Sequence, residues 1–122
     1  MRIEEAVDEC PKGWYLGPWN ADLDVSIGYA HTGVDDPHLH IRMTEIYMMA
    51  RGTATMRVEN ETIELVQDQV LVIEPGEAHT FLASSPDHFH FVIQTPGLHG
   101  EQARADKVRV SPSRLGLLDR DA

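Results

Sequence analysis

Two histidines separated by one residue, His38 and His40, constrain the fold of this chain more than any other feature. On a β-strand, residues two apart point to the same face, whereas a helix brings together residues three or four apart. The surrounding sequence shows no helical period, so the pair is expected on a strand. Glu45 follows shortly afterwards, and His79 lies further along the chain. Three imidazoles and one carboxylate suit a first-row transition metal, which predicts a metal site inside a β-structure.

Short strand-like runs, separated by turn residues, follow one another along most of the chain. Asn60-Glu61 lies between two such runs, and Pro75-Gly76 ends another. Many short strands with regular turn signals predict an all-β sandwich or barrel. The expected strands cover residues 14–16, 23–29, 38–42, 45–51, 53–59, 62–66, 70–73, 79–83 and 88–94.

The alternation of side chains along a strand assigns the residues of these runs to faces. If Glu45 points inward, Tyr47 and Met49 point inward with it. In the same way, His79 shares its face with Phe81. The predicted interior therefore contains both ligand candidates and aromatic side chains.

The run 88–94 has two unlike faces. One face carries His88 and His90, and the other carries three apolar side chains: Phe89, Phe91 and Ile93. Because apolar and aromatic side chains form cores more readily than histidine does, we expect the apolar face inside and both histidines outward or at an interface. The alternative places these histidines in the pocket, as acid–base groups or substrate contacts.

Composition narrows the class of protein. A chain of 122 residues forms one domain, and no apolar run reaches the roughly 18 residues of a membrane span. The formal charge of −10 disfavours nucleic acids and anionic membrane surfaces as partners. Cys10 is the only cysteine, and the acidic N-terminus has no apolar signal region. These features predict a cytoplasmic protein without an internal disulfide.

The ligand residues and their spacing resemble the motifs of the cupin superfamily, in its small single-domain, conserved-barrel form. His38-X-His40-X4-Glu45-X6-Gly52 matches the first cupin motif, and Pro75-Gly76-X2-His79 matches the core of the second. With the strand pattern, the resemblance extends over about residues 14–96.

Three positions depart from the family pattern. Gly33 lies one residue closer to the first histidine than usual, Gln67 replaces a turn glycine, and Ala83 replaces a closing asparagine. These changes affect turns and one pocket wall, and they leave all four ligand positions occupied.

The resemblance implies a small antiparallel β-barrel, a double-stranded β-helix or jelly roll, in a single domain over residues 1–122. It implies one divalent transition-metal ion (Fe, Mn, Ni, Zn or Cu), held by His38, His40, Glu45 and His79. Small cupins often form homodimers, and a homodimer is expected here.

For function, the resemblance implies a metalloenzyme of dioxygenase, decarboxylase, lyase or isomerase type that acts on a small organic molecule. The candidate catalytic residues are Glu45 and Tyr47, and the candidate substrate pocket contains Tyr47, Met49, Phe81 and His90. The alternative is a non-catalytic binding or sensor barrel. Arg51 shares the face of Glu45 but lies near the end of its strand, where solvent exposure is expected. No obvious Arg or Lys clamp for a carboxylate or phosphate lies on the predicted interior faces, which argues against strongly anionic substrates.

The C-terminal tail, residues 100–122, is rich in charged residues. Val108 and Val110 could add one more strand, and a docked segment and a frayed end are equally compatible with this composition. Three leucines could pack on the barrel or on a neighbouring molecule: Leu115, Leu117 and Leu118.

Overall fold

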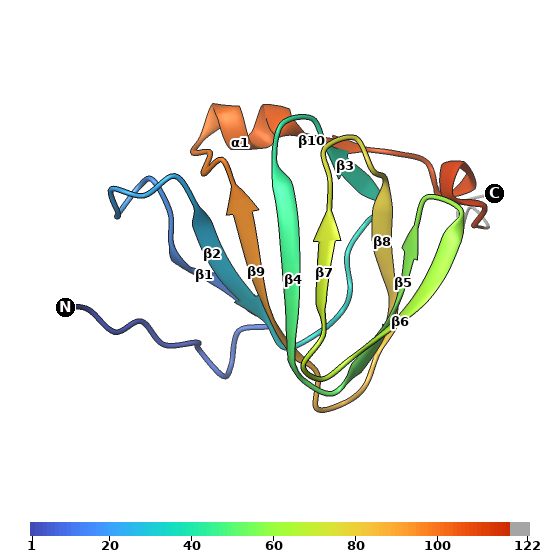
Figure 1. Cartoon of the computed structure of the whole chain (residues 1–122), viewed down its shortest axis with the longest axis horizontal. Coiled ribbons are helices and arrows are strands. Elements are labelled where there is room, and N and C mark those ends of the chain that lie inside the picture. The colour runs from blue at the N-terminus through green and yellow to red at the C-terminus, as the bar shows by residue number, and fades with distance from the viewer. Residues whose placement is uncertain (118–122) are drawn as a thin grey trace.

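The computed structural model describes residues 1–117 and consists of two five-stranded sheets that face each other (Figure 1). In spatial order, the first sheet contains β1 (Lys12–Leu16), β2 (Ser26–Ala30), β9 (Phe89–Thr95), β4 (Thr44–Arg51) and β7 (Val70–Ile73). The second contains β10 (Lys107–Arg109), β3 (His38–His40), β8 (His79–Ser84), β5 (Thr53–Val58) and β6 (Glu61–Val66). All neighbouring strands are antiparallel, which confirms the predicted jelly roll.

The apolar core lies between the two sheets. Its members come from inward positions of both sheets: Tyr47, Met49, Ala54, Met56, Leu65, Ile73 and Phe81. On β4, Glu45, Tyr47 and Met49 are all less than 5% exposed, as the alternation predicts. The strand therefore leads from a buried carboxylate at one end directly into the hydrophobic core.

The C-terminal tail is docked as far as it is described. Helix α1 (Glu101–Asp106) follows β9 and leads into β10, which pairs with β3 (Figure 1). A short 3-10 helix, η1 (Pro112–Leu115), buries the side chain of Leu115. The possible extra strand forms at β10 and includes Val108, whereas Val110 lies just beyond its end. Leu117 is half-buried, and Leu118 lies outside the described residues.

The predicted orientation of His88 and His90 is wrong. These side chains are 1% and 4% exposed and point into the barrel, whereas Phe89 and Phe91 lie on the other face of β9. The aromatic face has its own cover, because the ring of Tyr15 lies 4.9 Å from Tyr29 and 6.1 Å from Phe91.

The N-terminal segment completes this outer aromatic cluster. The backbone N–H of Val7 donates to the hydroxyl of Tyr29 (2.9 Å), and Tyr29 is 4% exposed. An aromatic face can therefore be shielded on the outside of the sheet, so its apolar character does not identify the barrel interior. Among residues 1–117, no helix is both long and apolar enough to cross a membrane.

Candidate metal centre

Three strands place the four candidate ligands at one end of the barrel. β3 carries His38 and His40 on its inner face, β4 carries Glu45, and β8 begins at His79. β3 and β8 are neighbours, and His38 pairs directly with His79 across them. All four side chains are at most 5% exposed.

The turn before β8 fixes this arrangement locally. Gly76 has a φ of +87°, which glycine adopts without the penalty that a side chain would bring. Its backbone N–H donates to the carbonyl of His40 (2.7 Å), which ties the turn to the ligand strand. The Pro75-Gly76 motif therefore positions His79 beside β3.

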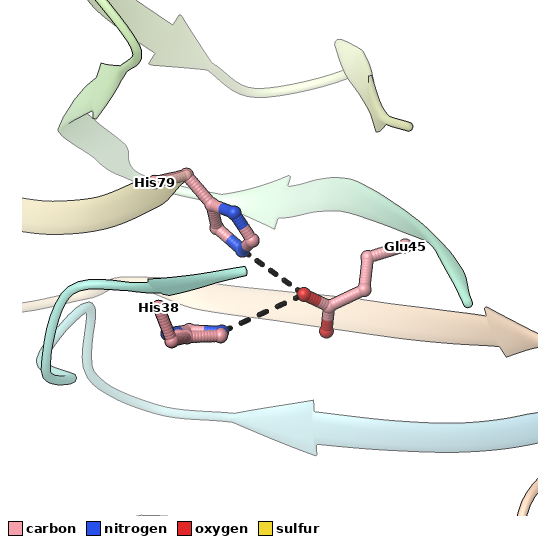
Figure 2. A group of neighbouring side chains, drawn as sticks. All are labelled: His38, Glu45 and His79. Atoms are coloured by element: carbon pink, nitrogen blue, oxygen red, sulfur yellow. Dashed lines mark hydrogen bonds and ion pairs between the residues drawn. The ribbon is translucent and has the colours of Figure 1, made fainter. Parts of the chain in front are cut away.

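The imidazoles converge on a single oxygen atom of Glu45. The distances from Nε2 to Oε1 are 3.0 Å for His40, 3.0 Å for His79 and 3.7 Å for His38. Figure 2 shows two of these contacts, from His38 and His79. Donor atoms of His38, Glu45 and His79 all lie within 4.8 Å of one another.

The second nitrogen of each imidazole is held from outside the cluster. Nδ1 of His38 donates to the carbonyl of Asp36 (2.7 Å), and Nδ1 of His79 donates to the carbonyl of Glu77 (2.9 Å). Because Nδ1 is held by these carbonyls, Nε2 is the nitrogen left to bind a metal ion, which would take the place of its contact with Glu45. The donor set and its orientation therefore fit a transition-metal ion.

His40 is oriented by a carboxylate that reasoning from the sequence misses. Its Nδ1 lies 3.2 Å from Oδ2 of Asp106, the last residue of α1, which is 3% exposed. The other oxygen of Asp106 accepts the backbone N–H of Arg42 (2.7 Å). No local motif indicates this role, because Asp106 lies 66 residues from His40 in the sequence.

Glu45 is held as a carboxylate. Burial by itself would raise the pKa of Glu45, but hydrogen bonds from the three imidazoles outweigh burial and hold its pKa well below the usual range. Burial lowers the pKa of His79, but the hydrogen bond to Glu45 and the charge of Glu45 act against burial, and the pKa of His79 is raised overall. Nε2 of Gln94, on β9, donates to Oε2 of Glu45 (3.0 Å) and fixes the second oxygen.

Tyr47 lies next to this carboxylate. Its hydroxyl donates to Oε1 of Glu45 at 3.4 Å, and burial together with the charge of Glu45 raises the pKa of Tyr47 well above its usual range. Tyr47 is therefore protonated at neutral pH and acts as a hydrogen-bond donor rather than as a base.

The ligand cluster opens into a cavity of about 880 Å³. Among the predicted pocket residues, Tyr47, Phe81 and His90 line it, whereas Met49 packs in the apolar core. The ring of His90 stacks on Phe81 with centroids 5.2 Å apart. A cavity of this size, with metal-type ligands on one wall and aromatic rings on another, suits a small organic molecule.

His88 and His90 form a separate pair that contacts no ligand residue through hydrogen bonds. Nε2 of His88 lies 2.7 Å from Nδ1 of His90, so one ring donates and the other accepts. Burial, and then the neighbouring His88, lower the pKa of His90 to about 3, and burial lowers the pKa of His88. Both rings are neutral at physiological pH.

Comparison with known protein families agrees with this geometry. The family model described as a cupin domain matches residues 27–94, which is more than half of the chain. The chain therefore belongs to the cupin family. No curated protein matches it.

Solved structures share the fold at low sequence identity. A protein from Planctomyces limnophilus is 21% identical with a TM-score of 0.67, over 88% of this chain and 96% of that one. Pac13 from Streptomyces, a nucleoside dehydratase, is 10% identical with a TM-score of 0.66, over 90% and 92% of the two chains. KdgF from a Halomonas species is 20% identical with a TM-score of 0.61, over 71% and 80%. These likenesses establish the fold of the barrel.

Proposed function

We propose that this cupin binds one divalent transition-metal ion (Fe, Mn, Ni, Zn or Cu) and is a metalloenzyme acting on a small organic molecule in the barrel. The ligands are His38, His40, Glu45 and His79. The observation that carries the proposal is the convergence of three Nε2 atoms on Oε1 of Glu45 while the three Nδ1 atoms are hydrogen-bonded outside the cluster. That division of roles is typical of metal-bound histidines.

A bound metal would supply Lewis acidity or redox chemistry at the cavity wall. The residues of the chain have separate tasks around it. Glu45 keeps its negative charge, and Gln94 fixes the orientation of its carboxylate. Tyr47 offers a proton-bearing hydroxyl on the cavity side, and Phe81 excludes water from the same wall. Glu45 and Tyr47 are therefore the proposed catalytic residues.

One structural neighbour supports a small polar substrate. Pac13 is a nucleoside dehydratase whose structure was determined with uridine, so a barrel of this shape accommodates a molecule with a ring and several hydroxyl groups. The cavity volume of about 880 Å³ is sufficient for such a ligand. A dehydratase or another lyase reaction is compatible with a Lewis-acidic site beside a tyrosine hydroxyl.

The test is the metal content of protein purified without a His-tag or chelator. We expect close to one transition-metal ion per chain in the wild type and close to none in His79→Ala, because His79 supplies one of four ligands. The matched control is His99→Ala, which removes a histidine that stacks on Trp19 (ring centroids 5.9 Å apart) away from the cluster.

If wild-type protein contains no metal and takes none up on reconstitution, the metal proposal is wrong. If it is loaded but only binds small molecules without turning them over, the non-catalytic binding barrel replaces the enzyme. A cytoplasmic location and a homodimer stay predictions, and size-exclusion chromatography with light scattering measures the oligomeric state.

A further inference from the structure

Four of the ten basic side chains of this acidic protein line the cavity, and the name rim is used below for the part of the lining that they form. The chain has 10 Lys and Arg against 20 Asp and Glu. Four of these basic residues line the cavity, both lysines among them: Lys12, Arg104, Lys107 and Arg109. Among the acidic residues within 1–117, two line it, Asp35 and Glu45. The cavity lining therefore has the opposite charge balance to the molecule as a whole.

The pairing of β10 with β3 places two of these cations beside the metal ligands. Lys107 pairs with His40 and Arg109 pairs with His38. Residues directly opposite each other in an antiparallel pair point to the same face, with Cβ atoms about 5 Å apart. Because the two histidines face the cavity, Lys107 and Arg109 project from that face too. Val108, between them, points away.

Two carboxylates near these cations, Asp35 and Asp36, have partners of their own. The carboxylate of Asp35 accepts hydrogen bonds from the Thr80 hydroxyl (2.7 Å) and the Phe81 backbone N–H (3.0 Å), so its orientation is fixed by the barrel. Arg109 lies 3.3 Å from Asp36, but both side chains are more than half exposed and such a pair is weak. Within residues 1–117, Lys12, Arg104 and Lys107 form no ion pair.

We propose that the cavity receives an anionic small molecule, whose carboxylate or phosphate group is bound by Arg104 and Lys107 while the rest of the molecule reaches the His38–Glu45–His79 cluster. Lys12 and Arg109 add to the positive field at the mouth. The inference rests on the proposed function, because it names the substrate class of the same cavity. It reverses the sequence-based expectation against anionic substrates.

That expectation depends only on the strands that carry the motifs. The basic residues come from β1 and from the segment after β9. Strand parity, as applied to the motif strands, says nothing about the orientation of residues in these two segments. In the folded protein, α1 and β10, which follow β9 (Figure 1), carry three of these residues, and β1 carries Lys12; all four line the cavity. Cations lining a concave site focus the local field, which raises the local concentration of anions and makes their binding sensitive to salt.

The experiment is an NMR titration of metal-free protein at low ionic strength, at pH 7.5, with inorganic phosphate and with succinate as separate probes. Three proteins are compared: the wild type, the double variant Arg104→Gln/Lys107→Gln, and the control Arg51→Gln. Arg51 is exposed at the far end of β4, about 20 Å from Glu45 along the strand, and the control removes a cation away from the rim.

We expect at least one probe to shift the amide signals of cavity residues in the wild type and in Arg51→Gln. In the double variant, binding should weaken by roughly tenfold or more, because two charged contacts are lost. The probe that binds identifies the group as phosphate or carboxylate. Equal affinity in the wild type and the double variant, or no binding of either probe to the wild type, would overturn the inference.

Metal content of the same proteins separates this inference from the proposed function. The double variant alters no proposed ligand, so it should retain close to one ion per chain. If anion binding to the metal-free protein is independent of Arg104 and Lys107, while the same protein takes up one metal ion per chain on reconstitution, only the substrate class is refuted. A wild type that binds the anion but takes up no metal refutes only the metal proposal.

Discussion

The barrel contains two His-X-His pairs with the same spacing and similar burial, His38 with His40 and His88 with His90. In the first pair each Nδ1 is bound outside the cluster, by the Asp36 carbonyl or the Asp106 carboxylate, and each Nε2 points at Glu45. In the second pair the two rings hydrogen-bond to each other. The first pair thus directs both Nε2 atoms at a common point where a metal could bind, and the second pair uses one nitrogen of each ring for the hydrogen bond between the rings.

Two histidine pairs with the same spacing and similar burial can thus have different hydrogen-bond partners, and only the first pair has the arrangement proposed here for metal binding. The groups next to each pair account for the difference between the pairs. A carboxylate attracts a cation and fixes the tautomer of a histidine, whereas an aromatic wall favours the neutral ring. His90 lies between Phe81 and Tyr47, at ring-centroid distances of 5.2 and 5.3 Å. Variants at either histidine pair, or at the residues that contact it, test this difference between the pairs.

The largest effect is expected from Asp106→Asn, which removes the charge behind His40. Loss of an orienting carboxylate typically lowers metal affinity by about 10- to 100-fold, and we expect a decrease in this range. Competition with a chromophoric chelator measures it. Asp36→Asn is the matched control, because His38 uses the backbone carbonyl of Asp36 rather than its side chain. Equal affinities for Asp106→Asn and the wild type would contradict the assigned role.

The second prediction concerns acid stability and the His88–His90 pair. Because the folded pKa of His90 is lowered to about 3, the unfolded chain binds a proton below about pH 6.5 that the folded chain does not. This contribution to stability is complete above about pH 6.5 and is lost as the pH falls toward 3. Between pH 7.5 and 5.0 it amounts to about 2 kcal/mol.

We therefore expect His90→Phe to lose about 2 kcal/mol less unfolding free energy than the wild type over that pH range. Urea unfolding of the metal-free proteins at the two pH values measures the difference. The titratable groups that act on His90 are His88 beside it and Glu45, with Tyr47 packed against its ring. Identical pH dependence in variant and wild type would show that His90 is protonated in the fold.

The smallest effect is expected from Tyr47→Phe. The hydroxyl lies 3.4 Å from Glu45, a long hydrogen bond, so its removal should change the unfolding free energy by less than about 1 kcal/mol and leave the metal content unaltered. Tyr29→Phe is the comparison, since the Tyr29 hydroxyl accepts a shorter bond (2.9 Å) from Val7. A loss of metal in Tyr47→Phe would mean that the tyrosine orients a ligand.

Local patterns are sufficient to predict the fold and the proposed ligands. Strand parity and the motif spacing depend on residues close in sequence, so the sequence alone assigns His38, His40 and Glu45 to the barrel interior. Parity also places Gln94 on the face of His88, His90 and Val92, but its contact with Glu45 requires the pairing of β4 with β9. Parity assigns each residue to one face of its strand, but it does not say which other strand lies alongside.

The errors and omissions have a common physical origin in contacts between distant segments. An outward orientation of His88 and His90 is predicted because Phe89 and Phe91 resemble core residues, and the cover that Tyr15 and Tyr29 provide is not visible in a local pattern. Asp106 and most of the basic rim come from the C-terminal segment, whose docking on β3 depends on strand pairing.

The most direct test of the contrast between the two histidine pairs is a crystal structure of metal-reconstituted protein with anomalous diffraction data. We predict one anomalous peak, bound by Nε2 of His38, His40 and His79 and by Glu45, at about 2.0–2.2 Å from each ligand atom. The hydrogen bond between His88 and His90 should be preserved. A peak at His88 and His90, or a fully reconstituted crystal without a peak at Glu45, would contradict the account.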